Sequence, residues 1–148
     1  MKKLQLEKYL KGKSVIIGIG DRLRGDDGIG CIIVEKLKEK IKNKNLLIIE
    51  AGTTPENYLE KIVNFNPDTI LFIDTLDFNS FPGDIKIIEP ENLLNTGTST
   101  HNFSLKLIFQ YLKARIKSRI LLIGIQPKNL NFNEELSEEV KKVLEDII

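Results

Sequence analysis

Between residues 18 and 30 the chain reads GIGDRLRGDDGIG, a glycine-rich stretch that contains two adjacent acids. It follows the apolar run of residues 14–20, which predicts a buried strand, and it leads into residues 29–43, whose apolar spacing predicts a helix. A loop between such a strand and helix lies at the carboxyl end of the strand, where open parallel sheets bind their ligands. The stretch therefore predicts an α/β fold and a ligand site within it.

The acids of this loop argue against nucleotide binding. A dinucleotide fingerprint needs a third glycine near position 23, where Leu23 stands, and a P-loop needs Lys and Ser or Thr directly after Gly25, where Asp26 and Asp27 stand. Carboxylates would repel a phosphate, because both groups are negatively charged. Carboxylate oxygens do bind hard and borderline metal ions, so the loop predicts a cation site or acid/base chemistry.

The rest of the chain continues the alternation of strands and helices. Further strands are predicted at residues 46–51, 69–76, 83–89 and 120–125, helices at 55–65, 102–116 and 134–148, and an irregular polar stretch at 92–99. The connection before residues 83–89 is too short for a crossover helix, so this strand is expected to run antiparallel to the others. We expect a single domain over residues 1–148 with a mixed sheet.

Composition excludes several classes of function. Twenty-two basic and 21 acidic residues nearly cancel, so the overall charge gives no argument for nucleic acid or a membrane surface as a partner. A single cysteine cannot form an internal disulfide, and the N-terminus lacks the apolar core of a signal peptide. No apolar run approaches the roughly 20 residues that span a bilayer. These features favour a cytoplasmic protein.

Three side chains are expected to converge on one solvent-reachable cleft at the carboxyl end of the strands, where they could share one ligand. Asp74 lies near the end of the predicted strand 69–76, at the same end of the sheet as Asp27 if the strands are parallel. His101 is the only histidine and lies at a helix start, where the helix dipole favours the neutral, metal-binding imidazole. Two carboxylates and one imidazole suit nickel, zinc, iron or manganese, with coordination positions left open.

Each of the three also has a structural interpretation. Asp27 could simply stabilise the first turn of the helix that follows it, and Asp74 could cap the loop at the end of its strand. A lone histidine is more often structural than a ligand.

Neighbouring residues are open to similar interpretations. Cys31 stands in a helical apolar pattern and is expected to be buried, and Asp77 fits a turn. Arg22 and Arg24 could be ordinary solvated charges, or they could bind a carboxylate of a partner.

Six short motifs, in this order, resemble the nickel-iron hydrogenase maturation endopeptidases. They are GIGDRLRGDDGIG at 18–30, AGTTPE at 51–56, LFIDTLD at 71–77, PG at 82–83, THN at 100–102 and GIQP at 124–127. The resemblance spans nearly the whole chain. It implies a three-layer α/β/α sandwich whose five-stranded sheet has the order 2-1-3-5-4, with strand 4 antiparallel.

The resemblance also implies a function. Such enzymes cut the precursor of a hydrogenase large subunit near its C-terminus, after nickel has been inserted. An acid of the first loop, an acid at the end of the third strand and a histidine bind the precursor's nickel, which matches Asp27, Asp74 and His101 as catalytic and metal-binding residues. Nickel then arrives with the substrate and is not held tightly by the free enzyme. No serine or cysteine nucleophile is evident, which favours attack by water with assistance from the metal or a carboxylate.

Two positions and two other functions stay open at this stage. Asp21 replaces the family's usual Asn, and its carboxylate could join the site or raise the pKa of a neighbouring acid. A slip of one residue would exchange Asp26 with Asp27 as the ligand. The alternatives to a maturation protease are a zinc-type hydrolase of small peptides or amides, and a non-catalytic module that binds nickel or a nucleotide.

Overall fold

The computed structural model, which describes residues 6–97 and 102–147, has a five-stranded sheet in the order β2-β1-β3-β5-β4. The parallel strands are β1 (Ser14–Ile19), β2 (Leu46–Gly52), β3 (Thr69–Thr75) and β5 (Arg119–Ile125). The short strand β4 (Ile85–Ile88) runs antiparallel to β5. Both the strand order and the antiparallel strand confirm the expected α/β fold.

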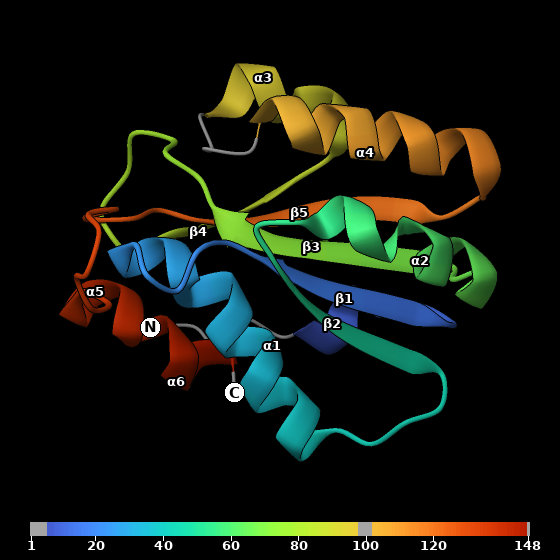
Figure 1. The fold of residues 1–148 in the computed structure, drawn as a ribbon, viewed down its shortest axis with the longest axis horizontal. Coiled ribbons are helices and arrows are strands. Elements are labelled where there is room, and N and C mark those ends of the chain that lie inside the picture. Colours follow the sequence, from blue (N-terminus) through green and yellow to red (C-terminus); the bar gives the residue numbers. More distant parts are fainter. Residues whose placement is uncertain (1–5, 98–101, 148) are drawn as a thin grey trace.

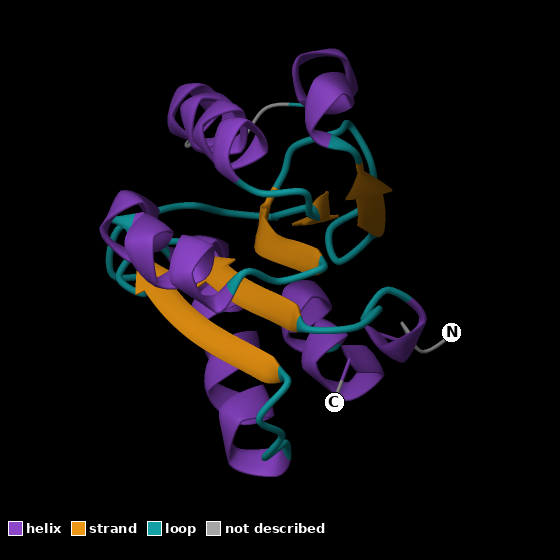
Figure 2. Ribbon diagram, turned by 90° about the vertical axis from the view of Figure 1, so that its right-hand side faces the viewer, coloured by secondary structure: helices purple, strands orange, loops and turns teal. Residues whose placement is uncertain are grey.

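Helices cover both faces of this sheet (Figures 1 and 2). One face carries α1 (Ile29–Lys40), α5 (Glu138–Lys141) and α6 (Val143–Ile147), and the other carries α2 (Leu59–Phe65), α3 (Leu93–Thr96) and α4 (Asn102–Arg115). Short 3-10 turns are η1 (Leu6–Lys8), η2 (Gly25–Gly28), η3 (Pro55–Tyr58) and η4 (Pro90–Asn92). In the described part of the chain, no helix is both long enough and apolar enough to cross a membrane.

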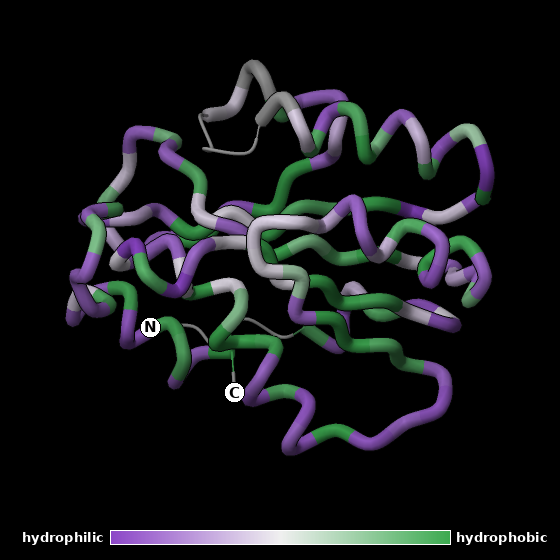
Figure 3. The backbone as a smooth tube through the Cα atoms, viewed as in Figure 1, coloured by the Kyte–Doolittle hydropathy of each residue, from purple (hydrophilic) through white to green (hydrophobic). Residues whose placement is uncertain are grey.

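The alternation of side chains along each strand divides the core into two layers. Ile17 and Phe72 point to the α2–α4 face, where the Phe72 ring meets Phe109 edge-on at 5.1 Å between centroids. Ile16 and Leu71 point to the α1 face. Residues that face either layer are mostly apolar, so the central strands are largely green in Figure 3. A sheet that is buried on both faces leaves its loops at the strand ends as the place for a ligand site.

Two glycines let α1 start directly on top of the sheet. A Cβ at Gly18 would lie 2.3 Å from the carbonyl oxygen of Gly30, and one at Gly30 would lie 2.4 Å from that of Ile73. Real Cβ atoms do not come this close to backbone oxygens, so the helix could not approach β1 and β3 with any larger residue at either position. The approach fixes the loop between β1 and α1 over the end of β3.

Two segments differ from the sequence expectation. The stretch 92–99 contains the short helix α3, which forms because Leu93 is buried in the core and because the Thr96 hydroxyl donates to the carbonyl of Asn92 at 2.6 Å. The last helix begins at Glu138 instead of residue 134, because Ser137 is its N-cap. Lys142 separates α5 from α6, but its backbone keeps helical angles, so the two follow one path.

We expect Gly30→Ala to lower the free energy of unfolding by about 1–3 kcal/mol, the usual cost of overpacking, although alanine is normally the better helix former. Urea denaturation measures the change. The matched control is Lys36→Ala, at an exposed position of the same helix, which should stay within about 0.5 kcal/mol of the wild type. A neutral or stabilising Gly30→Ala would contradict the close approach of α1 to the sheet.

Candidate active site

Asp27 lies in η2, in the loop after β1, and is only 3% exposed. Its Oδ2 accepts a hydrogen bond from the backbone N–H of Asp21 at 2.8 Å, and its Oδ1 accepts one from the hydroxyl of Thr75 at 3.1 Å. The carboxylate therefore bonds across to the end of β3 instead of capping the helix that follows it.

Asp74 is fully buried near the end of β3, and its Oδ1 accepts from the backbone N–H of Thr75 at 2.8 Å. Thr75 thus bonds to both acids, to Asp27 through its hydroxyl and to Asp74 through its N–H. Because β1 and β3 are neighbours while the chain leaves them in opposite directions along the sheet, the acids lie at the topological switch point. Sequence reasoning did not single out Thr75, although a hydroxyl beside a strand-end acid was a signal.

His101, the third predicted ligand, lies outside the described residues. Within the described ranges, the structure has no group of three His, Cys, Asp or Glu side chains that could hold a metal ion. The structure therefore brings together two of the three predicted site residues and leaves the place of the third as a prediction.

The two neighbouring acids of the loop point to different partners. Four hydrogen bonds reach the buried Asp26 carboxylate. Their donors are the N–H of Lys128 at 2.8 Å and of Asn129 at 3.1 Å, and the hydroxyl and N–H of Ser137 at 2.9 and 2.7 Å. Asp26 therefore anchors the segment that follows β5, and Asp27 is the acid that faces Asp74.

The unusual Asp21 turns its side chain along its own loop. Its Oδ1 accepts from the N–H of Leu23 at 2.9 Å, and its Oδ2 lies 3.7 Å from Nε of Arg24. An Asn side chain can accept the same bond from Leu23, because both residue types carry an oxygen at that position. The contribution of Asp21 to the acid pair is its backbone N–H, which holds Asp27.

Arg22 is occupied within the protein. Its Nε and one terminal nitrogen donate to both oxygens of Glu50 at 3.0 and 2.9 Å, and the same terminal nitrogen lies 2.8 Å from Glu35. The guanidinium lowers the pKa of the Glu35 carboxyl through this hydrogen bond and its charge. Arg22 therefore ties the loop to β2 and α1, and of the two arginines only Arg24 stays largely exposed, at 55% of its side chain.

Gln126, in the GIQP motif, fixes the loop that follows Asp74. Its Oε1 accepts from the N–H groups of Phe78 at 2.8 Å and Ser80 at 3.2 Å, and its Nε2 donates to Asp77 at 3.0 Å. Asp77 also accepts from the N–H of Asn79, which makes the turn that its sequence context indicates. The bond from Gln126 lowers the pKa of the Asp77 carboxyl. A single polar residue after an apolar strand was the sequence signal for this role.

Cys31 is buried under the loop, with its sulfur 3.5 Å from the carbonyl oxygen of Gly20. Burial raises the pKa of its thiol to about 11. The thiol is therefore protonated at neutral pH and does not supply a nucleophile.

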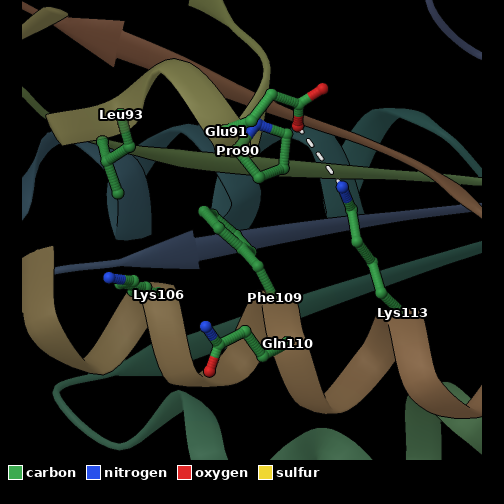
Figure 4. A pocket seen from close by; sticks show the side chains of 7 residues that line it. All are labelled: Pro90, Glu91, Leu93, Lys106, Phe109, Gln110 and Lys113. Carbon is green, nitrogen blue, oxygen red and sulfur yellow. Dashed lines mark hydrogen bonds and ion pairs between the residues drawn. The ribbon is translucent and has the colours of Figure 1, made fainter. Parts of the chain in front are cut away.

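The hollows on the α4 side of the molecule are lined by residues other than the acid pair. Figure 4 shows one of about 250 Å³ between η4, α3 and α4, with Phe109 among its lining and the ion pair of Glu91 and Lys113 at 3.3 Å beside it. A second, of about 290 Å³, lies between the η3–α2 segment and α4. The sequence predicts a solvent-reachable cleft at Asp27 and Asp74, whereas the structure covers both, because their carboxylates turn inward to Thr75.

Known proteins are similar to this chain in both sequence and fold. A sequence model described as HycI, hydrogenase maturation protease, matches residues 31–148. The chain is 40% identical to a Methanocaldococcus jannaschii protein named as a hydrogenase maturation protease, over 95% of this chain and 88% of that protein. It is 31% identical to the hydrogenase 3 maturation protease of Escherichia coli, over 90% and 85%. The crystal structure of the NiFe hydrogenase maturation protease HycI from Thermococcus kodakarensis matches with a TM-score of 0.85 and 38% identity, over 95% of this chain and 91% of that one.

The different environments of the two acids predict different effects on stability. Asp26→Asn should lower the free energy of unfolding by about 2 kcal/mol or more, because the amide nitrogen would face buried donors that now bond to the carboxylate. Asp27→Asn should change it by less than about 1 kcal/mol, because an amide can still accept from Asp21 and donate to the Thr75 hydroxyl. Urea denaturation of both variants is the measurement. Equal losses would show that Asp27 is as structural as Asp26.

The buried thiol predicts a loss of stability at alkaline pH. Burial raises the pKa of Cys31 from 9.0 to about 11, so between these values the unfolded chain releases the proton while the folded chain keeps it. The thiol's contribution to stability is complete below pH 9 and falls as the pH rises toward 11. Urea midpoints of the wild type and of Cys31→Ala, compared across this range, should converge with rising pH. Parallel curves would show that the thiol titrates alike in both states.

Proposed function

The chain belongs to the hydrogenase maturation protease family, and we propose that it removes the C-terminal extension from the precursor of a nickel-iron hydrogenase large subunit. We propose further that it recognises nickel already bound to that precursor. The observation that carries this proposal is the pairing of Asp27 and Asp74 through Thr75, at the switch point between β1 and β3.

The acid pair suits a metal that arrives with the substrate. The two hydrogen bonds on Asp27 use two of the roughly four lone-pair positions of a carboxylate, so oxygen positions remain for a metal. Two carboxylates alone make an incomplete ligand set for nickel, and His101 is proposed as the third ligand. The precursor would supply the remaining ligands. Because both acids are covered and bonded to protein donors, the free enzyme is expected to hold nickel weakly.

The chain's own residues supply positioning and proton transfer in the proposed reaction. Thr75 and the N–H of Asp21 fix the orientation of Asp27, which lets it hold the metal or accept a proton from the attacking water. The water oxygen bonds to the scissile carbonyl carbon, and the amide nitrogen leaves with a proton returned by the same acid. A metal bound to the pair would polarise the carbonyl. The thiol of Cys31 takes no part in this reaction.

The test mixes the purified protein with nickel-loaded large-subunit precursor and measures the released C-terminal peptide by mass spectrometry. We expect cleavage by the wild type and a loss of at least about a hundredfold in rate for Asp27→Asn, Asp74→Asn and His101→Ala, the size of effect typical of a lost acid, base or metal ligand. The matched control is Asp77→Asn, three residues beyond Asp74 in the loop that follows β3. Its amide oxygen can accept the bonds from Gln126 and Asn79, so this variant should stay active. Intact precursor after incubation with the wild type would refute the proposed function.

The nickel dependence has a separate control. Precursor without nickel, incubated with the enzyme and a chelator, should stay uncut, and a free peptide with the cleavage sequence should not replace it, because the metal positions the scissile bond. Efficient cleavage without nickel would instead indicate a direct carboxylate mechanism. A protein that carries close to one zinc ion per chain as purified would favour the zinc-type hydrolase.

A further inference from the structure

Large apolar side chains gather at the carboxyl end of the strands without being buried. Among the described residues, Leu23 is 58% exposed, Phe81 82% and Phe132 58%. They lie in the loops that follow β1, β3 and β5, and these loops come together at the left-hand end of Figure 1. This is also the end that carries Asp27 and Asp74. Exposed apolar groups that collect on one end of a protein mark an interaction site.

Leu23, Arg24 and Phe132 lie on two loops that contact each other, and these three exposed residues are called the carboxyl-end patch below. The carbonyl of Leu23 accepts from the N–H of Asn133 at 2.7 Å, which joins the two loops. The Arg24 guanidinium lies 5.8 Å from the centre of the Phe132 ring, and its side chain is 55% exposed. Its nearest carboxylate, Asp21, is 3.7 Å away, so this ion pair is a loose one.

Hydrogen bonds between the two loops hold the carboxyl-end patch in place. The N–H of Gly25 donates to the carbonyl of Glu134 at 3.1 Å, the N–H of Asp26 donates to the carbonyl of Asn129 at 2.9 Å, and the Asp26 carboxylate accepts four bonds from the segment that carries Phe132. The exposed side chains therefore stand on loops that are already ordered. Such preorganisation reduces the conformational entropy that these loops lose when a partner binds.

We propose that the carboxyl-end patch docks the folded precursor, which would present an apolar side chain beside a carboxylate. Aromatic residues and arginine are enriched at the centres of protein interfaces, and Arg24 is the cation on this surface that can pair with an acid of the partner. The patch lies on exposed loops and lines none of the described pockets, which suits a protein surface better than a small ligand enclosed in a pocket. The inference rests on the proposed function, because it names how the same substrate is held.

The position of the patch gives it a role beside the chemistry. Arg24 and Asp27 belong to the same short loop, so a precursor bound to Leu23 and Phe132 would have its neighbouring segment over the acid pair. The carboxyl-end patch would then account for affinity, while the acids account for the metal and the cut. Variants of the two should therefore change different kinetic constants.

The experiment measures binding and cleavage separately. Affinity is measured by surface plasmon resonance with immobilised nickel-loaded precursor and the inactive Asp74→Asn enzyme, in which Phe132→Ser or Leu23→Ser is then introduced. Each should weaken binding about tenfold or more, as expected for an interface hot spot. In the active enzyme, the same changes should raise KM with little change in kcat. The matched control is Leu107→Ser, which removes a 51%-exposed leucine on α4 and should change neither constant.

The contribution of the Arg24 charge to binding is tested by varying the salt concentration. Arg24→Gln, introduced into the same Asp74→Asn enzyme, should weaken binding at low ionic strength and make it depend less on salt than in the Asp74→Asn parent. Affinities within twofold of the Asp74→Asn parent for all three patch variants would overturn the docking proposal while leaving the proposed function intact. A wild-type enzyme that binds through the patch but does not cut would reject the function and keep the surface. Absence of both binding and cleavage would reject both. Thermal unfolding of each variant checks that the fold is retained.

Discussion

The buried carboxylate of Asp26 is the constraint that organises the reactive end of this protein. Four donors from the segment after β5 converge on it, although Lys128 is 102 residues away in sequence. The same serine that donates to Asp26 caps α5, so one carboxylate fixes a loop, a distant segment and a helix start. With Asp26 turned to this segment, its neighbour Asp27 is directed to the opposite side, toward the end of β3.

The sheet supplies the second half of the site. Glycines at positions 18 and 30 let α1 approach β1 and β3, and Thr75 then bonds to both acids. Gln126 holds the loop beyond Asp74 from the neighbouring strand β5. Each contact belongs to the backbone or to a buried polar side chain, so the acid pair is preorganised, as the proposed binding of a metal requires. Both carboxylates are covered, so under the proposed function the precursor must gain access to them as it docks.

Much of the fold could be predicted from the sequence. Apolar runs separated by glycine-rich loops indicated the parallel strands, and the short connection before β4 indicated its antiparallel direction. Which of Asp26 and Asp27 faces Asp74 could not be decided from the sequence. The two acids are adjacent in one loop, and the donors that distinguish them come from the other end of the chain. The start of α5 at Glu138 was also not predicted, because it depends on Ser137, whose N–H and hydroxyl both donate to the distant Asp26. His101 remains a sequence-based prediction.

One measurement tests the assignment of the metal-facing acids most directly. It is the anomalous scattering of nickel in crystals of the enzyme bound to nickel-loaded precursor. We predict a single nickel peak within bonding distance of one carboxylate oxygen of Asp27 and one of Asp74, with Asp26 still bonded to Ser137. A peak bonded to Asp26, or one remote from both Asp27 and Asp74, would contradict it.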